Sequence, residues 1–465
     1  MTRWFLLLTL FVPSLAPAAE LKAGAFAIDV TPRKYPVSVN GGMSDRKVSS
    51  AHDPIHARCL VLDDGKTKVA IVTVDSCMIP RELIDDAKAK AEKATGIPGS
   101  NILISATHTH SAPTVAGVFQ SDPDEDYVPY LADKIAEGIE KAHANRVPAK
   151  AGWNVIPEPA HLHNRRWVMK PTFDLTNPFG EKDKVRMNPP RNVPELVETA
   201  GPIDPDLSVL SVQTSDGKPL ALHANYSLHY VGGLPALSAD YFGVFCDRVG
   251  GIIRADAKFM PALSNGTSGD VNNVVFQGTP SPRTQPGEQL RHVAEAVAQV
   301  AGKAVAGTKH SSDVTLAAAE REVELKVRKP SASDIERAEK ILAAAKGREL
   351  KSREEIYARE TVLLAKYPDT VKLKLLALRI GDLGITAIPC EVFTDIGLAI
   401  KKQTPLKGTF NISLANGYNG YLPTPAQHAL GGYETWRARS SYLETTASDT
   451  ITKVVLELLN EVAKK

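Results

Sequence analysis

Two histidines one residue apart, His108 and His110, lie in the segment ISATHTHSAPT, directly after an apolar run. In extended backbone, an H-x-H pair places both side chains on the same side of the chain. Neutral imidazole at such a position is a ligand for zinc, iron or nickel. The alternative is a hydrogen-bonded rim of an active site without metal, and this short pattern alone does not decide between the two.

A second histidine segment, NYSLHYVGG, also follows an apolar run and contains His229. Two glycines after it allow the backbone to turn sharply. His223 lies six residues earlier and competes for the same role. Glu391, in AIPCEVF, has a carboxylate that is able to bind a metal, although an acidic residue there also suits the first turn of a helix.

Two further features suggest chemistry near these residues. The segment GTSGDVNN has small residues whose backbone N–H groups are able to face an anion or oxyanion, unless it is a plain turn. Asp240 is a candidate partner for a metal-binding histidine, because such ligands usually need one, or else an N-cap of the helix that follows.

The elements that position the H-x-H pair form a βαβ unit. Residues 69–75 are an apolar β-branched run, 81–95 have helical spacing, and 101–106 are a second apolar run. Strand, helix and strand at this spacing predict parallel pairing. The two histidines then lie just past the C-terminal end of a parallel strand, where open α/β sheets place their ligand sites.

The rest of the chain continues the alternation of strands and helices. Together the segments predict an α/β fold, a layered sandwich of mixed sheets flanked by helices, with the metal site at the C-terminal ends of strands. Residues 157–206 lack periodicity and predict a long loop. The other predicted strands begin the segments 218–233 and 259–273, which then run into loops, and form a hairpin-like pair at 375–389 around GDLG. The other predicted helices lie at 240–254, 288–305, 333–367 (with a capping box of Ser333 and Glu336), 391–403 and 448–465.

Composition and the N-terminus limit the class of protein. The 465 residues carry a formal net charge of +2 without a basic block, so nucleic-acid binding has no support. Arg3, the run WFLLLTLFV and the small residues APAA predict a signal peptide over residues 1–19, followed by one exported domain over 20–465. No later segment is long enough to span a membrane, and the four cysteines are expected to be buried thiols.

Seven motifs in order resemble the catalytic domain of neutral/alkaline (non-lysosomal) ceramidases. They span nearly the whole predicted mature chain, from about Ala23 to about Glu434. The motifs are AGAFAIDVTP, ATHTHSAPT, HNRRW, NYSLHYVGG with LSADYFG, SGDVNN, AIPCEVFTDIG, and NGYNGYLPT with GGYE.

The resemblance implies a zinc site and names its residues. Four positions match the family's zinc ligands, and this favours His229 over His223. The implied ligands are His108, His229, Glu391 and Tyr421. His110, Arg165 and Tyr433 match residues that line the family's site and contact the scissile amide.

The implied reaction is hydrolysis of the amide of an N-acylsphingosine or related N-acyl lipid, with zinc-bound water attacking the carbonyl. Two departures bear on the substrate. Asn272 replaces a family serine, and its amide is able to donate to an oxyanion but cannot act as a nucleophile. The sequence after the GGYE motif also predicts no immunoglobulin-like domain of the kind found at the C-terminus of the family. The alternatives are a zinc hydrolase for another ester, amide or glycan, and a non-catalytic binding protein.

Overall fold

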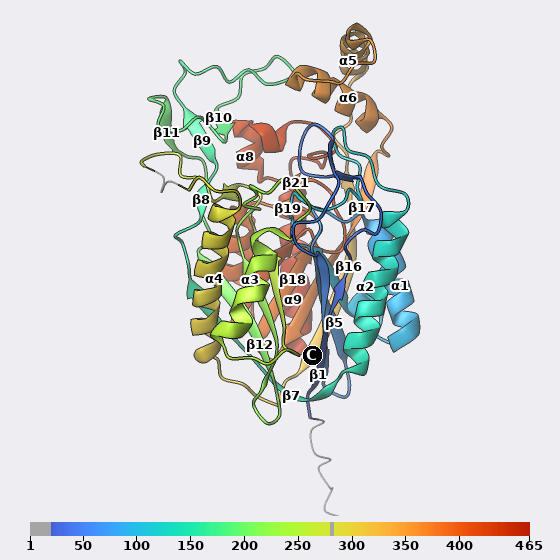
Figure 1. Ribbon diagram of the computed structural model, residues 1–465. Coiled ribbons are helices and arrows are strands. Elements are labelled where there is room, and N and C mark those ends of the chain that lie inside the picture. The colour runs from blue at the N-terminus through green and yellow to red at the C-terminus, as the bar shows by residue number, and fades with distance from the viewer. Residues whose placement is uncertain (1–19, 280–282) are drawn as a thin grey trace, which may run out of the picture.

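A computed structural model describes residues 20–279 and 283–465. Within these ranges, two β-sheets lie face to face and helices cover both outer faces (Figure 1). The predicted α/β layered sandwich of mixed sheets flanked by helices is confirmed.

The larger sheet has eight strands, and their order across it differs from their order in the chain. It is antiparallel except for the two outermost pairs, β13 with β14 and β5 with β6. Its strands in spatial order are β14 (Met260–Asn265), β13 (Pro219–Tyr226), β12 (Asp206–Thr214), β7 (Val147–Pro157), β1 (Lys22–Asp29), β4 (His56–Asp63), β5 (Lys68–Val74) and β6 (Ile102–Ala106).

The smaller sheet has four strands and packs against the inner face of the larger one. The core between the sheets is formed by alternate apolar residues of both, such as Leu60, Leu210, Leu376 and Phe410. Its strands in spatial order are β16 (Leu316–Lys326), β17 (Thr370–Ile380), β18 (Leu383–Ile388) and β20 (Gly408–Ser413), and only β18 and β20 are parallel.

Amphipathic helices bury their apolar faces on the two outer surfaces. On the larger sheet, α1 (Arg81–Thr95) and α2 (Tyr127–Ala144) cover one half, and α3 (Asp240–Ile252) and α4 (Glu288–Ala306) cover the other. On the smaller sheet lie α7 (Thr394–Gln403) and α9 (Ala447–Lys464). Helices α5 (Ala332–Ala345) and α6 (Arg353–Ala365) pack on each other at the upper end of the molecule in Figure 1.

The larger sheet curls so that its two edges approach each other. Edge strand β14 contacts β6, and β20 lies against both. Residues just after β20 continue the closure, because Asn416 donates its backbone N–H to Ile104 and Ala106 donates to Leu414. This curling brings the C-terminal ends of the parallel strands β6, β13 and β18 to one end of the sandwich.

Short strands and turns complete that end of the molecule. Residues 157–206, predicted as a loop, instead contain short strands. Most of these strands pair with one another, and residues 163–164 pair with residues 271–272. The remaining elements are β2 (Val37–Val39), β3 (Arg46–Val48), β8 (His163–Asn164), β9 (Arg166–Met169), β10 (Val185–Met187), β11 (Leu196–Thr199), β15 (Val271–Asn272), β19 (Glu391–Val392), β21 (Tyr421–Leu422), α8 (Pro425–Leu430) and the 3₁₀ turns Gly99–Asn101 and Tyr433–Thr435.

Two other predictions about helix starts are wrong. Helix α5 has its capping box at Ser331 and Asp334, two residues before the predicted pair Ser333 and Glu336. Glu391 is not in the first turn of α7, because the chain first forms β19, which pairs with β21.

The four cysteines are free and buried, as predicted. None of the helices in the described ranges combines the length and the apolar character needed to cross a bilayer. The predicted signal segment, residues 1–19, lies outside the described residues.

Candidate metal centre

His108 lies two residues past the end of β6, in a left-handed backbone conformation with φ of 71°. A positive φ is uncommon for a residue with a side chain and is often found at functional sites. The conformation is fixed by the His108 N–H, which donates to the Ser76 carbonyl at 2.9 Å. The turn, rather than an extended H-x-H strand, directs the ring into the interior.

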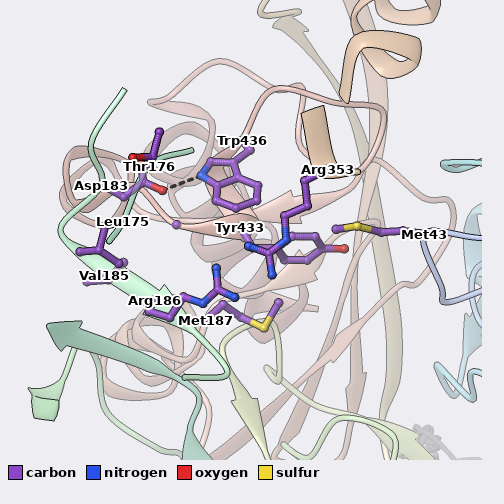
Figure 2. Close-up of a pocket in the computed structure, with 11 residues that line it drawn as sticks. Met43, Leu175, Thr176, Asp183, Val185, Arg186, Met187, Arg353, Tyr433 and Trp436 are labelled. Atoms are coloured by element: carbon purple, nitrogen blue, oxygen red, sulfur yellow. Dashed lines mark hydrogen bonds between the residues drawn. The ribbon is translucent and has the colours of Figure 1, made fainter. Parts of the chain in front are cut away.

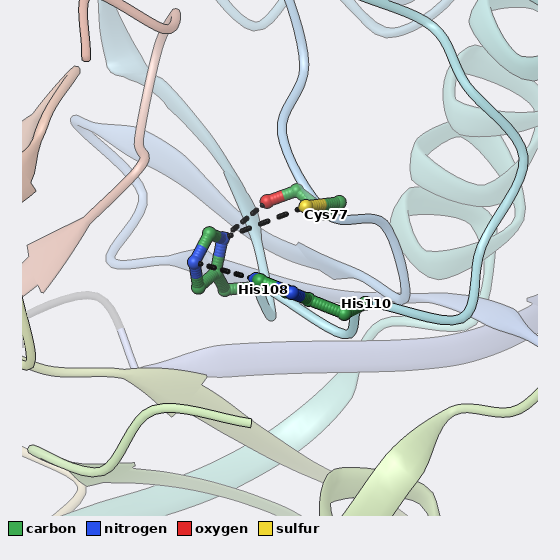
Figure 3. A group of neighbouring side chains, drawn as sticks. All are labelled: Cys77, His108 and His110. Carbon is green, nitrogen blue, oxygen red and sulfur yellow. Dashed lines mark hydrogen bonds between the residues drawn. The ribbon is translucent and has the colours of Figure 1, made fainter. Parts of the chain in front are cut away.

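Three imidazoles converge on one point. The Nε2 atom of His108 lies 3.1 Å from Nε2 of His110 and 3.2 Å from Nε2 of His229. Figure 3 shows the rings of His108 and His110 edge to face, with an interplanar angle of 88°. His229 reaches the cluster from the loop three residues past the end of β13.

Backbone carbonyls determine which ring nitrogens face the cluster. Nδ1 of His108 lies 2.8 Å from the carbonyl oxygen of Cys77, and Nδ1 of His229 lies 3.2 Å from that of Ser268. A carbonyl only accepts hydrogen bonds, so each Nδ1 carries the proton. In the neutral rings the Nε2 lone pairs therefore point at each other.

Glu391 closes the cluster from the smaller sheet, three residues past β18. Its Oε1 accepts a hydrogen bond from the Tyr418 hydroxyl at 3.2 Å. Its Oε2 is buried, has no hydrogen-bond partner among the described residues and lies 3.3 Å from Nε2 of His108. Burial lowers the pKa of His108, but the neighbouring Glu391 and Cys77 outweigh it and raise the pKa to about 10.

This arrangement fits a metal ion. The carboxylate of Glu391 and the Nε2 atoms that face it favour positive charge between them, which a proton on His108 or a metal ion would supply. Ligand atoms of His108, His229 and Glu391 lie within 4.8 Å of one another, and all three side chains are buried. Two imidazole nitrogens and a carboxylate oxygen are a ligand set that zinc commonly takes.

Tyr421 and Arg165 lie on the neighbouring side of the pocket. Tyr421 pairs with Glu391 across β19 and β21, and its hydroxyl accepts from Arg165 at 3.1 Å. Burial, with Glu391 next, raises the pKa of Tyr421 well above its usual value. Arg165 also donates to Glu434 at 3.1 Å, and the carboxylate of Glu434 holds Arg166 at 2.7 Å. The guanidinium of Arg165 is thereby fixed beside the cluster.

His110 is held as a neutral ring. It stacks on Tyr230 with centroids 3.6 Å apart. Gly41 packs against its other side with φ of +109°, and a Cβ there would lie 2.3 Å from the ring. Burial, the neighbouring His108 and Arg165 lower the pKa of His110 well below its usual value. A neutral imidazole in this position is able to accept a proton.

A pocket opens onto the cluster. Its walls include five of the residues implied by the motifs, among them Tyr433, whose ring lies 5.7 Å from that of Tyr421. The lining residues are Gly41, Gly42, Met78, His108, His110, Val118, Phe119, Glu391, Tyr418, Tyr421, Tyr433 and Ser440.

Comparisons of sequence find partial matches. No family model matches the chain. It is 25% identical over 227 residues to neutral ceramidase B of Dictyostelium discoideum, and the aligned region covers 45% of this chain and 28% of that protein. Neutral ceramidase A of the same organism is 24% identical over 228 residues, which covers 46% and 27%. The matched region is thus less than a third of the length of these relatives.

Comparisons of structure cover almost all of the chain. The neutral ceramidase from Pseudomonas aeruginosa superposes with a TM-score of 0.73 over 96% of this chain and 75% of that one, at 17% identity. A ceramidase complexed with C2 gives the same TM-score at 16% identity, over 96% and 76%. The chain has the neutral ceramidase fold. The resemblance indicated by the motifs is confirmed by both kinds of comparison.

Two candidates from the sequence, His223 and Asp240, do not take the roles considered for them. His223 is buried between the sheets, where its Nε2 lies 3.1 Å from the Ser264 hydroxyl, so it is outside the cluster. Asp240 does not bond a histidine. Its carboxylate accepts the backbone N–H groups of Val231, Gly232 and Tyr241, and it thereby holds the loop that carries His229.

The segment GTSGDVNN uses its backbone within the protein. Gly269 donates its N–H to Val392 and Val271 donates to Ser268, so these groups do not form an anion site. The side chain of Asn272 donates to Asn188 at 2.8 Å and accepts from the Val274 N–H at 2.9 Å.

Several residues that shape the candidate site had little or no signal in the sequence. Cys77 and Ser268 act through backbone carbonyls, which carry no residue-type signature. Glu434 is fully buried with two arginines, and only its place in the GGYE motif indicates it. Tyr418 was within the NGYNGY motif, but spacing alone does not show that its hydroxyl reaches Glu391.

Proposed function

We propose that this protein is an exported zinc-dependent hydrolase that cleaves the amide bond of an N-acyl lipid, as its neutral ceramidase relatives are named to do. The observation that carries the proposal is the buried set of His108, His229 and Glu391, whose ligand atoms lie within 4.8 Å of one another, beside a pocket lined by His108 and Glu391. Oε2 of Glu391 lies 3.3 Å from Nε2 of His108, and a metal ion between them would satisfy both atoms.

His108, His229 and Glu391 would hold the ion, with Tyr421 as the fourth ligand. A bound zinc ion supplies Lewis acidity, which polarises a carbonyl and activates water. The chain itself supplies the proton acceptor, since His110 is neutral and its Nε2 faces the cluster. Arg165, fixed by Glu434, offers positive charge where an oxyanion forms, and Tyr433 offers a hydroxyl donor.

In this proposal Asn272 assists the reaction as a hydrogen-bond donor to the oxyanion and not as the nucleophile. One N–H of its side-chain amide donates to Asn188, and an amide nitrogen has a second N–H to offer. Since asparagine cannot be a nucleophile, the replacement of the family serine favours a substrate other than ceramide itself. A zinc hydrolase for another amide or ester is therefore the second candidate.

Metal analysis tests the site. Purified protein should hold about one zinc per chain, and His108→Ala and Glu391→Ala should each lose it. His223→Gln is the matched control, because this buried histidine lies outside the cluster and its variant should keep zinc. A wild-type chain that binds no zinc after reconstitution would refute the proposal.

Activity with a panel of substrates separates the candidate functions. Zinc-loaded protein should hydrolyse N-acyl lipids, and ceramide, N-acylethanolamine and simple esters would rank the leaving groups. Zinc binding without hydrolysis of any of them would support a non-catalytic binding protein instead.

We further propose export by cleavage after Ala19. N-terminal sequencing of protein from its native host should find Glu20 at or near the first position. An intact Met1 or Thr2 on the folded protein would contradict this.

A further inference from the structure

A second pocket lies beside Tyr433 and Trp436 (Figure 2). This pocket and the first one, which opens onto the cluster, share Tyr433, and Met43 of the second pocket follows directly after Gly41 and Gly42 of the first. A substrate bound over the metal cluster is therefore able to extend past Tyr433 into this space.

Two arginines line this second pocket. Arg186 comes from β10 and Arg353 is the first residue of α6. Figure 2 shows both guanidinium groups extending toward Tyr433. They belong to segments far apart in the sequence, so their meeting is a property of the fold.

Neither arginine has a carboxylate partner among the described residues. The Nε of Arg186 is buried and has no hydrogen-bond partner there. Arg353 lies over the ring of Trp436 at 6.0 Å, but forms no ion pair in that part of the chain. By contrast, Arg165 and Arg166 next to the cluster share Glu434, and Arg337 on the neighbouring helix pairs with Glu354.

The one acidic residue among the lining residues is already engaged. Asp183 accepts from the indole N–H of Trp436 at 2.7 Å and from the Asn177 amide at 3.3 Å. The pocket lining therefore has two guanidinium groups and one carboxylate, so its net charge is positive. Burial lowers the pKa of Arg186, the positive charge of Arg353 lowers it further, and Asp183 opposes this shift.

We propose that Arg186 and Arg353 bind an oxyanion group of the substrate, so that the preferred substrate is an N-acyl compound with an acidic head group rather than a neutral one. A carboxylate, sulfonate or phosphate would bridge the two guanidinium groups and offset their repulsion. This assignment rests on the proposed function for the identity of the scissile bond. Because Tyr433 borders both pockets, the acidic group would project from the scissile amide past Tyr433.

Matched substrates test the assignment through kinetics. N-acyltaurine and N-acylethanolamine with the same acyl chain differ mainly in the sulfonate. Wild-type protein should favour the taurine compound in kcat/KM. Arg186→Gln and Arg353→Gln should each lower the ratio of the two kcat/KM values by roughly tenfold or more, as expected for loss of a charge-assisted hydrogen bond. Arg337→Gln, on the neighbouring helix, should leave the ratio unchanged.

Calorimetry tests binding without catalysis. Hexanesulfonate has no amide, so its binding to the full chain does not depend on hydrolysis. It should bind wild-type protein about tenfold more tightly than either glutamine variant, and more tightly than inorganic sulfate. Equal binding to all three proteins would overturn the assignment, and sulfate binding as tight as hexanesulfonate would indicate a free anion rather than a substrate group.

The two tests distinguish failure of this inference from failure of the proposed function. If neither amide is hydrolysed, the proposed function is wrong, and hexanesulfonate binding still decides whether the arginines form an anion site. If both amides are hydrolysed with the same ratio in wild-type and variant proteins, only the anion assignment is wrong. Arg353 is exposed, so its variant keeps the test valid if Arg186→Gln fails to fold.

Discussion

Each histidine of the cluster is oriented by a neighbour that is not itself a ligand. Backbone carbonyls orient His108 and His229, and the ring of Tyr230 orients His110. The side chain of Asp240 holds the loop around His229 rather than the ring. The side chains around a metal ligand usually affect its affinity strongly.

Tyr418 is the neighbour most open to a test, because its hydroxyl donates to Oε1 of Glu391. We expect Tyr418→Phe to weaken zinc binding by about 10- to 100-fold, since the carboxylate loses its orienting hydrogen bond. Competition with a chelator of known affinity would measure this. Tyr442→Phe is the control, as its hydroxyl donates to Asn419 outside the cluster. Equal zinc affinity in both variants would contradict the role of Tyr418.

Substitutions of Asn272 and His108 should have different effects on turnover and on zinc binding. Asn272→Ala should reduce turnover, on the order of 100-fold for loss of an oxyanion donor. His108→Ala should abolish it together with zinc binding. Steady-state kinetics on one accepted substrate, with zinc content measured in parallel, decides the matter. An Asn272→Ala protein that holds zinc and is as inactive as His108→Ala would show that Asn272 is essential to the chemistry.

At this scale the sequence indicated the candidate ligands but not their surroundings. His108 and His229 follow apolar strands, and that position was readable. Glu391 was ambiguous, since an acidic residue before a helix has an ordinary explanation. The carbonyls of Cys77 and Ser268 were not readable, because any residue type provides a carbonyl.

The start of helix α5 depends on a capping box formed by Ser331 and Asp334. Ser331 accepts the N–H of Asp334, whereas Ser333 only contacts the Ser331 hydroxyl. We expect Ser331→Ala to lower the free energy of unfolding by about 1 kcal/mol, and Ser333→Ala to change it by a few tenths at most. Urea unfolding of both variants measures the difference. Similar losses would contradict the cap position seen in the structure.

Helix α1 contains a buried lysine, Lys88, and the free-energy cost of burying its charged amine depends on pH. Lys88 lies 3.5 Å from Glu320, and burial lowers its pKa from 10.5 to about 8. Below pH 8 the amine is charged in both the folded and the unfolded chain, so folding pays the full cost of burying the charge. Between about pH 8 and 10.5 the folded chain loses the proton first, and the cost declines.

Lys88→Met should therefore raise the free energy of unfolding at pH 7, by on the order of 1–3 kcal/mol. The gain over wild type should shrink as pH rises from about 8 to 10.5. Denaturant titrations across this range test the trend. Lys90→Met, on the exposed face of the same helix, should show little change at any of these pH values.

Elements with clear periodicity were predicted closely. Helix α1 begins and ends where its spacing indicated, and the parallel pairing of β5 with β6 followed from the βαβ pattern. Residues 157–206 were not predictable, because strands of two to four residues are too short to show alternation. Their pairing depends on segments brought together by the whole fold, such as β8 with β15.

On the scale of the whole molecule, the site depends on the curled larger sheet. β6 and β13 lie far apart in its strand order, yet the histidines that follow them touch, because β14 and β6 approach each other. The sequence indicated which strand ends carry the candidate ligands. The closure that brings them together involves residues beyond position 400, and no local pattern contains that information.

The division of the ligands between two sheets has a thermodynamic consequence. His108 and His229 follow strands of the larger sheet, and Glu391 follows a strand of the smaller one, so one ion would link the two layers. A ligand that binds only the folded chain stabilises it by mass action. Each tenfold rise in free zinc above the dissociation constant adds about 1.4 kcal/mol. The melting temperature of the protein would then rise with the free zinc concentration around it.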